Sequence, residues 1–322
     1  MDKRFEELIE IILAENISDL HFTLEKELTI EGRVGREFIK IPQKPNDSQL
    51  LYFLQDLANL DLSQKSNPQS GSFEYTYQQN KYAFRFAFLQ TNGIMSGVLR
   101  ILNFREAITL NNLVLKGTQR ALFKAWTQYE NGLILISGPT GSGKTTTAYS
   151  LLASMKSRKV YTLEDPIEIY HQGYVQIQIN PAVGLDYDNG IKQLLRHDPD
   201  VILIGEIRDE KTARMAFRCA LTGHLVITTI HASSCIGAIS RLVELGISKL
   251  DQQDVVKGIA NQRLVTLSNG LKRVSLYEIF SKNDLEAYFN QQRKGLPTFA
   301  AEIAYAYQKH WITLEEAKKV IF

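Results

Sequence analysis

The fold is decided by the stretch Gly132-Leu-Ile-Leu-Ile-Ser-Gly-Pro-Thr-Gly-Ser-Gly-Lys-Thr-Thr146. Its apolar start, Leu133 to Ile136, predicts a buried strand. The glycine-rich run after it keeps the spacing Gly-x-x-x-x-Gly-Lys-Thr, in which backbone N–H groups turn inward around phosphate oxygens. A helical pattern follows from Thr146 to Met155, so the positive end of a helix points to the same place. The stretch therefore predicts a strand, a phosphate-binding loop and a helix.

Two side chains of this loop carry specific chemistry. Lys144 supplies a point charge for the outer phosphates of a nucleotide, and the Thr145 hydroxyl is the expected Mg²⁺ ligand. A glycine-rich turn with an incidental lysine is the alternative, but it explains neither the strand nor Thr145. The expected nucleotide-binding residues are Gly138, Pro139, Thr140, Gly141, Ser142, Gly143, Lys144, Thr145 and Thr146.

The composition is that of an ordinary globular protein. The 322 residues are 44% hydrophobic and 22% charged, which allows one large domain or two. A net charge of +2 gives no support for a general nucleic-acid-binding surface. The cysteines, Cys219 and Cys235, form either a disulfide or, as we prefer, two buried thiols in a reducing compartment. Because the chain has neither a membrane-spanning apolar run nor a signal peptide, we expect a cytoplasmic protein.

The patterning changes along the chain and predicts its domains. Apolar and polar residues alternate in the first part, as in an antiparallel sheet with one covered face. Apolar strands then alternate with helices, which predicts a mostly parallel α/β sheet with strands at 133–137, 160–164, 201–205 and 225–229. The expected divisions are an α+β domain at 1–102, a linker at 103–112, an α/β domain at 113–276 and a helical tail at 277–322.

Acidic residues follow two of these strands. Glu164, Asp165 and Glu168 come after the strand at 160–164, and Glu206 ends the strand at 201–205. Carboxylates at strand ends near a phosphate loop can position the attacking water or bind Mg²⁺, although the first cluster can also be a solvated acidic turn. Gly205 stands where many ATPases with a phosphate-binding loop have Asp. Without that Asp, Glu206 binds Mg²⁺ either directly or through water. The sequence does not decide which of Glu164, Glu168 and Glu206 is the general base.

Two histidines and one arginine complete the set from this domain. His231 follows the last expected strand, where it can sense the γ-phosphate, and His224 precedes that strand. The alternative for a lone histidine is a structural role. Arg208 is a candidate for stabilising phosphate charge, and its alternative is an ion pair with Asp209 or a neighbouring carboxylate.

Four segments together resemble the secretion ATPase superfamily, the motors of type II secretion and type IV pili. The resemblance runs through nearly the whole chain from about residue 17, and the segments are in the order and at spacings compatible with that family. They are Gly138–Thr146, Leu163–Glu168, Asp198–Asp209 and Thr222–His231.

The resemblance implies hexameric ATPases with a PAS-like N-terminal domain and a RecA-like C-terminal domain. It implies that ATP with Mg²⁺ binds between the two domains. Arginines of the N-terminal domain reach the phosphates in this family, and Arg85 and Arg100 hold the matching positions. Each of these arginines can instead simply lie on the polar face of a strand. The linker at 103–112 is the implied hinge.

Finer features indicate which motor this is. Many relatives carry a four-cysteine zinc site, but residues 262–278 contain no cysteine, so no zinc is expected. The chain begins close to the PAS-like domain, and residues 255–265 resemble the assembly-type sequence. It is most similar to the competence ATPases of Gram-positive bacteria, which power assembly of a type IV-like pilus for DNA uptake.

That resemblance also implies the partners. They are other subunits of a homohexamer and a polytopic inner-membrane platform protein, so the motor works at the cytoplasmic face of the membrane. Direct nucleic-acid binding is not expected. A retraction motor of the twitching-motility type is the first alternative. A RecA-like nucleic-acid translocase is the second, and the near-neutral charge argues against it.

Overall fold

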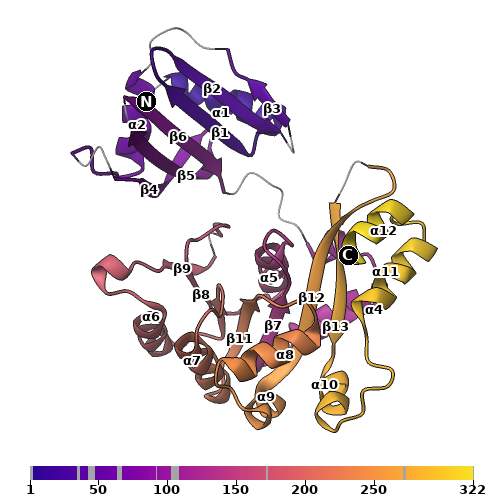
Figure 1. Ribbon diagram of the computed structural model, residues 1–322. Coiled ribbons are helices and arrows are strands. Elements are labelled where there is room, and N and C mark those ends of the chain that lie inside the picture. The colour runs from indigo at the N-terminus through magenta and orange to yellow at the C-terminus, as the bar shows by residue number, and fades with distance from the viewer. Residues whose placement is uncertain are drawn as a thin grey trace. The chain divides into compact units, whose positions relative to one another are not determined.

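The computed structural model describes residues 3–34, 37–42, 48–63, 67–91, 93–102, 109–171, 173–270 and 273–321 (Figure 1). The chain divides into two compact units, residues 1–106 and 107–322. Residues 103–108 of the predicted linker lie outside the described ranges, and helix α3, Leu110–Leu113, begins within its last residues.

The first unit is a six-stranded antiparallel sheet with two helices, α1 (Lys3–Glu15) and α2 (Ser48–Leu57). Both helices contribute apolar side chains to a single core with one face of the sheet, for example Phe5 of α1 and Leu54 of α2. Helix α2 is followed by Asn59 in a left-handed conformation with φ 53°, which does not continue a helix. In spatial order the strands are β3 (Glu37–Lys40), β2 (Leu28–Val34), β1 (Asp19–Leu24), β6 (Ile94–Ile101), β5 (Asn80–Thr91) and β4 (Gln69–Tyr77).

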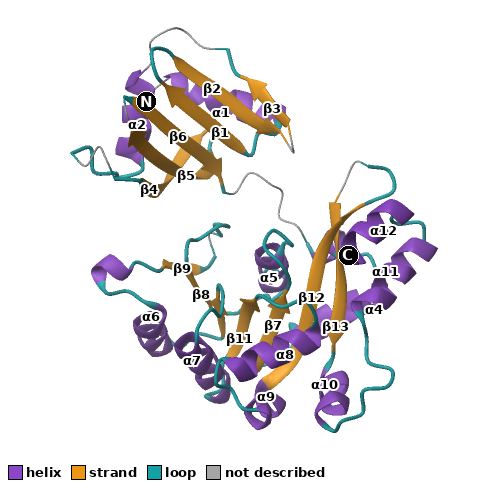
Figure 2. Cartoon of the chain, in the orientation of Figure 1, coloured by secondary structure: helices purple, strands orange, loops and turns teal. Residues whose placement is uncertain are grey.

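The second unit is built on a seven-stranded, mostly parallel sheet (Figure 2). Successive residues of the strand before the phosphate loop, β7 (Gly132–Ser137), point into different cores, Leu133 into one and Ile134 into the other. Both faces of the sheet are therefore buried, as the continuous apolar runs predict. The spatial order is β13 (Arg273–Phe280), β12 (Val256–Thr266), β7 (Gly132–Ser137), β11 (Leu225–Ile230), β10 (Val201–Ile204), β8 (Val160–Glu164) and β9 (Val175–Gln178).

Helices cover both faces of this sheet. One core includes side chains of α4 (Gly117–Trp126) and α5, the helix after the phosphate loop (Lys144–Leu152). The other core includes side chains of α6 (Tyr187–Leu194), α7 (Glu210–Leu221), α8 (Cys235–Glu244), α9 (Lys249–Val255) and α10 (Lys282–Phe289). The predicted α/β class with a mostly parallel sheet is confirmed.

The helical end of the chain starts later than the sequence predicts. Strand β13 continues to Phe280, so the predicted boundary at 276/277 falls inside a strand, and Ser281 caps the first helix of the tail. The last helices, α11 (Phe299–Gln308) and α12 (Leu314–Ile321), pack against β12 and β13 around Val265 and Leu276. The tail is therefore attached to the hairpin that lies next to the phosphate-loop strand.

Both cysteines are buried free thiols, as expected in preference to a disulfide. Burial raises the pKa of the Cys219 thiol to about 12, so this thiol stays protonated and unreactive near neutral pH. Within the described ranges, none of the helices combines the length and the apolar character needed to cross a membrane.

Candidate active site

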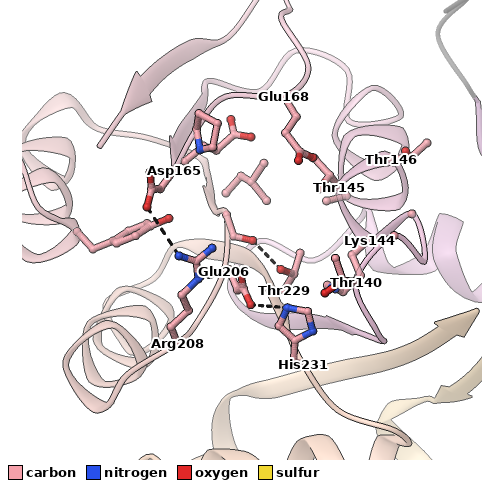
Figure 3. A pocket seen from close by; sticks show the side chains of 18 of the residues that line it. Thr140, Lys144, Thr145, Thr146, Asp165, Glu168, Glu206, Arg208, Thr229 and His231 are labelled. Carbon is pink, nitrogen blue, oxygen red and sulfur yellow. Dashed lines mark hydrogen bonds and ion pairs between the residues drawn. The ribbon is translucent and has the colours of Figure 1, made fainter. Parts of the chain in front are cut away.

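The phosphate loop opens onto a cavity of about 500 Å³, here called the loop cavity (Figure 3). It lies at the carboxyl ends of β7, β8, β10 and β11, which are in parallel register with one another. Such edges of α/β sheets are where ligands usually bind. The predicted site residues that line this cavity are Thr140, Gly141, Gly143, Lys144, Thr145, Thr146, Glu164, Glu168, Glu206, Arg208 and His231.

The loop is already in a conformation suited to an anion. Gly143 has φ 89°, which favours glycine, and it leads directly into the first turn of α5. The ammonium of Lys144 donates hydrogen bonds to the carbonyl oxygens of Gly138 at 3.0 Å and Pro139 at 3.1 Å. Burial lowers the pKa of Lys144, and the charges of Glu206 and Glu168 oppose that effect. A cation thus lies over the loop, within reach of a phosphate.

Two buried amides from β12 hold the loop in place. The side-chain amide of Gln262 donates to the carbonyl oxygen of Ser142 at 2.7 Å. Asn261 donates to the Ser137 hydroxyl at 2.8 Å and to the carbonyl oxygen of Ala232 at 3.0 Å. Neither residue was predicted from the sequence as part of the site. The available signal was a pair of adjacent amides directly after the apolar Ile259 and Ala260, because each amide needs a partner once it is buried.

Glu206 is the centre of a polar cluster in the loop cavity. Its Oε1 lies 2.8 Å from Nε2 of His231, and its Oε2 accepts a hydrogen bond from Nε of Arg208 at 3.0 Å. Arg208 also reaches Asp165 at 3.8 Å, whereas Asp209 caps helix α7 by accepting from Thr212 N (Figure 3). Arg208 therefore pairs with neighbouring carboxylates, as its alternative interpretation expects, while facing the loop cavity.

The first acidic cluster divides into residues with different environments. Glu164 is only 3% exposed, and its Oε1 accepts from the hydroxyls of Tyr149 and Thr162, both at 2.6 Å. Burial raises the pKa of its carboxyl group. Glu168 and Asp165 are less buried and project into the loop cavity (Figure 3). The interpretation of this segment as a solvated turn is wrong for Glu164.

Close packing explains why residue 205 is a glycine. A Cβ at this position would lie 3.3 Å from both Cα of Glu164 and the carbonyl oxygen of Leu163. The backbone of β8 therefore leaves little room for the Asp that many such ATPases have here. The Thr145 hydroxyl and the Glu206 carboxylate still supply oxygen donors, and Mg²⁺ in nucleotide sites needs few protein ligands besides phosphates and water. The donor set fits Mg²⁺.

His224 does not belong to the loop cavity. It precedes β11, whereas His231 follows β11, so the strand separates them by its whole length. Nδ1 of His224 lies 3.2 Å from the Thr222 hydroxyl and 3.2 Å from the carbonyl oxygen of Cys219. These contacts fasten the end of α7, and the predicted catalytic role of His224 has no support from the geometry of this cavity.

Arg85 and Arg100 lie in the first unit. They are directly opposite one another on the antiparallel strands β5 and β6, so they share one face of that sheet. Nε of Arg100 lies 2.6 Å from Oδ1 of Asp19, whose side chain is 8% exposed. The sheet therefore presents two guanidinium groups side by side, one of them anchored by a carboxylate.

Residues 1–302 match the model of the type II/IV secretion system protein family. The chain belongs to this family. It is 33% identical to the competence protein ComGA of Bacillus subtilis over 92% of this chain and 89% of that protein. It is 37% identical to type II secretion system protein E of Pseudomonas aeruginosa over 79% of this chain, but it spans only 52% of that protein.

Solved structures of two ATPases share the fold. The pilus retraction motor PilT with bound ADP is 28% identical, with a TM-score of 0.79 over 98% of this chain and 96% of that chain. The ATPase DotB of Legionella pneumophila is 22% identical with a TM-score of 0.76 over 98% of this chain, a likeness of fold alone. The expected resemblance to secretion and pilus motors is confirmed.

Proposed function

We propose that the protein is a motor ATPase that hydrolyses ATP in the loop cavity to drive assembly of a competence pilus for DNA uptake. One observation carries the proposal. The phosphate loop, Lys144 and the Glu206 cluster converge on one cavity in a chain that matches a competence protein along 92% of its length.

The triphosphate of ATP lies along Gly138 to Thr146. Lys144 leaves the carbonyl oxygens of Gly138 and Pro139 and moves to the β- and γ-phosphates. Thr145 would hold Mg²⁺, together with Glu206 either directly or through water. Bound there, Mg²⁺ supplies positive charge that neutralises the phosphate oxygens.

Glu206 positions the attacking water. Its carboxylate is held by His231 and Arg208 at the strand end that faces the loop. His231 senses the γ-phosphate through its contact with Glu206. Glu168 is the second candidate for the base because it projects into the same cavity. Glu164 is the least suited of the three, since it is almost completely buried and its Oε1 already accepts two hydroxyl donors.

Arg85 and Arg100 stabilise charge on the transferred phosphoryl group from the N-terminal domain, residues 1–102. Residues 103–112 are the hinge of a change in domain angle that accompanies binding and hydrolysis. The working form is a homohexamer at the cytoplasmic face of the membrane, where it moves a polytopic platform protein and does not touch DNA. These are properties that the resemblance implies.

The test is the steady-state ATPase rate of purified protein carrying Lys144→Ala, with exposed Lys282→Gln as the control. We expect K144A to keep its fold and to lose hydrolysis, and K282Q to hydrolyse ATP like the wild type. A wild-type rate in K144A would end the assignment. Strong stimulation of the wild type by single-stranded DNA would instead indicate a translocase.

The similarity to PilT favours one second candidate, a retraction motor. An assembly motor and a retraction motor differ in what the cell shows after deletion of the gene. Loss of an assembly motor removes surface pili and transformation together. Loss of a retraction motor leaves cells with pili that cannot withdraw, so abundant pili after deletion would favour this candidate.

A further inference from the structure

A second cavity of about 670 Å³ lies on the other side of the phosphate loop, toward β12 and β13. It shares Thr140, Gly141, His231 and Leu264 with the loop cavity. Its remaining wall comes from the first half of the loop, the segment after His231, the β12–β13 hairpin and helix α12. The two cavities therefore meet at the part of the loop that would surround the γ-phosphate.

The two cavities differ in charge. The loop cavity is lined by four carboxylates and two cations, which are Glu164, Asp165, Glu168, Glu206, Lys144 and Arg208. The second cavity, here called the basic cavity, is lined by Arg263, Arg273 and Lys319, and none of the described residues that line it carries a carboxylate. Lys319 pairs with Glu315 at 2.9 Å, but both side chains are well exposed, so water screens this pair.

The basic cavity also contains polar groups that lack a partner. Ser142 is 3% exposed, and its hydroxyl makes no hydrogen bond with any described residue. Nε of Arg263 is likewise buried without a partner among the described residues. The other nitrogens of Arg263 donate to the carbonyl oxygens of Val320 and Ser233, and its guanidinium lies 4.9 Å from the Phe299 ring centroid. Ser142 and Arg263 therefore each keep an unused hydrogen-bond donor, which an oxyanion could accept.

We propose that the basic cavity receives the inorganic phosphate released by hydrolysis. The inference rests on the proposed ATPase function. Phosphate forms beside Thr140, Gly141 and His231, which belong to both cavities. While ADP occupies the loop, the carboxylates of the loop cavity repel the product, and the three cations on the other side attract it. Phosphate therefore leaves past His231 toward the β12–β13 hairpin, ahead of ADP.

The binding test measures thermal stabilisation by inorganic phosphate at constant ionic strength, so it requires no hydrolysis. The test variant is Arg273→Gln with Lys319→Gln, which removes two exposed cations of the cavity. The matched control is Lys282→Gln with Arg293→Gln, which also removes one exposed arginine and one lysine paired to a glutamate four residues away.

We expect phosphate to stabilise the wild type, the control and Lys144→Ala, which loses the loop site only. We expect the R273Q/K319Q protein to bind phosphate about tenfold more weakly, since two of the three cations that attract the anion are removed. The charge-conserving pair Arg273→Lys and Lys319→Arg should restore binding. Undiminished phosphate affinity in R273Q/K319Q, or loss of binding in K144A alone, would overturn the proposal without bearing on ATP hydrolysis.

A kinetic test separates release from cleavage. Single-turnover cleavage is followed by quenched flow, and free phosphate by a fluorescent phosphate-binding sensor. We expect the delay between the two signals to lengthen several-fold in R273Q/K319Q and to stay at the wild-type value in the K282Q/R293Q control. Coincident signals in the test variant would contradict the proposed exit. Absence of cleavage in the wild type would contradict the ATPase assignment instead.

Discussion

Nε2 of His231 lies 2.8 Å from Oε1 of Glu206, and this contact joins the carboxyl ends of β11 and β10 beside the phosphate loop. A further hydrogen bond, from the Thr229 hydroxyl to the carbonyl oxygen of Gly205 at 2.7 Å, ties the same two strand ends together. Glu206 is therefore a positioned carboxylate rather than a flexible surface acid. A change at His231 is transmitted to Glu206 through one hydrogen bond.

Glu206→Gln should abolish most of the hydrolysis while leaving ATP bound. Glutamine keeps the shape of the side chain but is a poor proton acceptor, so we expect kcat to fall by about 10²–10⁴-fold. The dissociation constant of ATP should change little. Glu244→Gln, which changes an exposed carboxylate paired with Arg241, is the control and should hydrolyse ATP normally. A wild-type kcat in E206Q would move the role of base to Glu168.

Gln262→Ala should weaken ATP binding by releasing the loop. Removing the amide leaves the buried carbonyl oxygen of Ser142 without its partner, which costs about 1–3 kcal/mol of stability. We expect about tenfold weaker ATP binding, the change that 1.4 kcal/mol produces. Isothermal titration with ATP and urea unfolding measure the two effects.

The chain offers a matched control for this variant. Gln252 is also fully buried, and its amide donates to the carbonyl oxygens of Ile239 and Ile247, which do not belong to the loop. Gln252→Ala should lose a similar amount of stability and keep its ATP affinity. Equal losses of ATP affinity in both variants would mean that Gln262 acts only through stability.

Glu164→Gln should stabilise the protein in a pH-dependent way. Burial raises the pKa of Glu164, so the folded state favours the protonated carboxyl and loses stability as the pH rises through the folded-state pKa. Glutamine stays neutral and can still accept the Tyr149 hydroxyl. Below the unfolded pKa of about 4.3 the two proteins should be equally stable. Near pH 8 the variant should be more stable by about 0.5–2 kcal/mol, as is common for substitutions that relieve a functional site.

Urea unfolding at both pH values measures this difference. The exposed Glu286 of α10, changed to Gln, serves as the control and should show no pH-dependent gain. A Glu164→Gln variant that was less stable than the wild type near pH 8 would show that the ionised carboxylate contributes to folding, against the account given for Glu164.

Arg85→Gln should lower kcat without a loss of stability. A guanidinium that stabilises transferred phosphoryl charge is worth at least about 10²-fold in rate. Arg100→Gln is less informative, because it also leaves the nearly buried Asp19 carboxylate unpaired. Lys81→Gln removes an exposed cation from the same strand and is the control. Normal hydrolysis in R85Q would mean that Arg85 has no part in hydrolysis and only forms part of the polar face of its sheet.

The sequence was sufficient for the elements with strong periodicity. The apolar runs around Leu133 and Val201 predict buried parallel strands, and the glycine spacing predicts the loop between β7 and α5. These features are local, so they can be read without knowing the tertiary contacts. The sequence also predicts that Glu206, Glu168 and His231 lie close together, because parallel strands bring their carboxyl ends to one edge of the sheet.

Other features depend on contacts between distant segments. Helix α12 begins with half of a capping box, since Thr313 accepts from Glu316 N while the Glu316 carboxylate accepts from Thr266 N on β12. Strand β13 extends past Tyr277 because its register with β12 continues to Phe280. Gln262 acts on a loop residue 120 positions away. Such pairings become visible only in the folded chain.

If ATP hydrolysis in the loop cavity drives pilus assembly, one substitution at the phosphate loop should remove the pili. The measurement is the number of surface pili on cells whose chromosomal gene carries Lys144→Ala. We expect cells without pili, although the variant protein is present at its normal level. Pili in normal or increased number would show that hydrolysis at this loop does not drive their assembly.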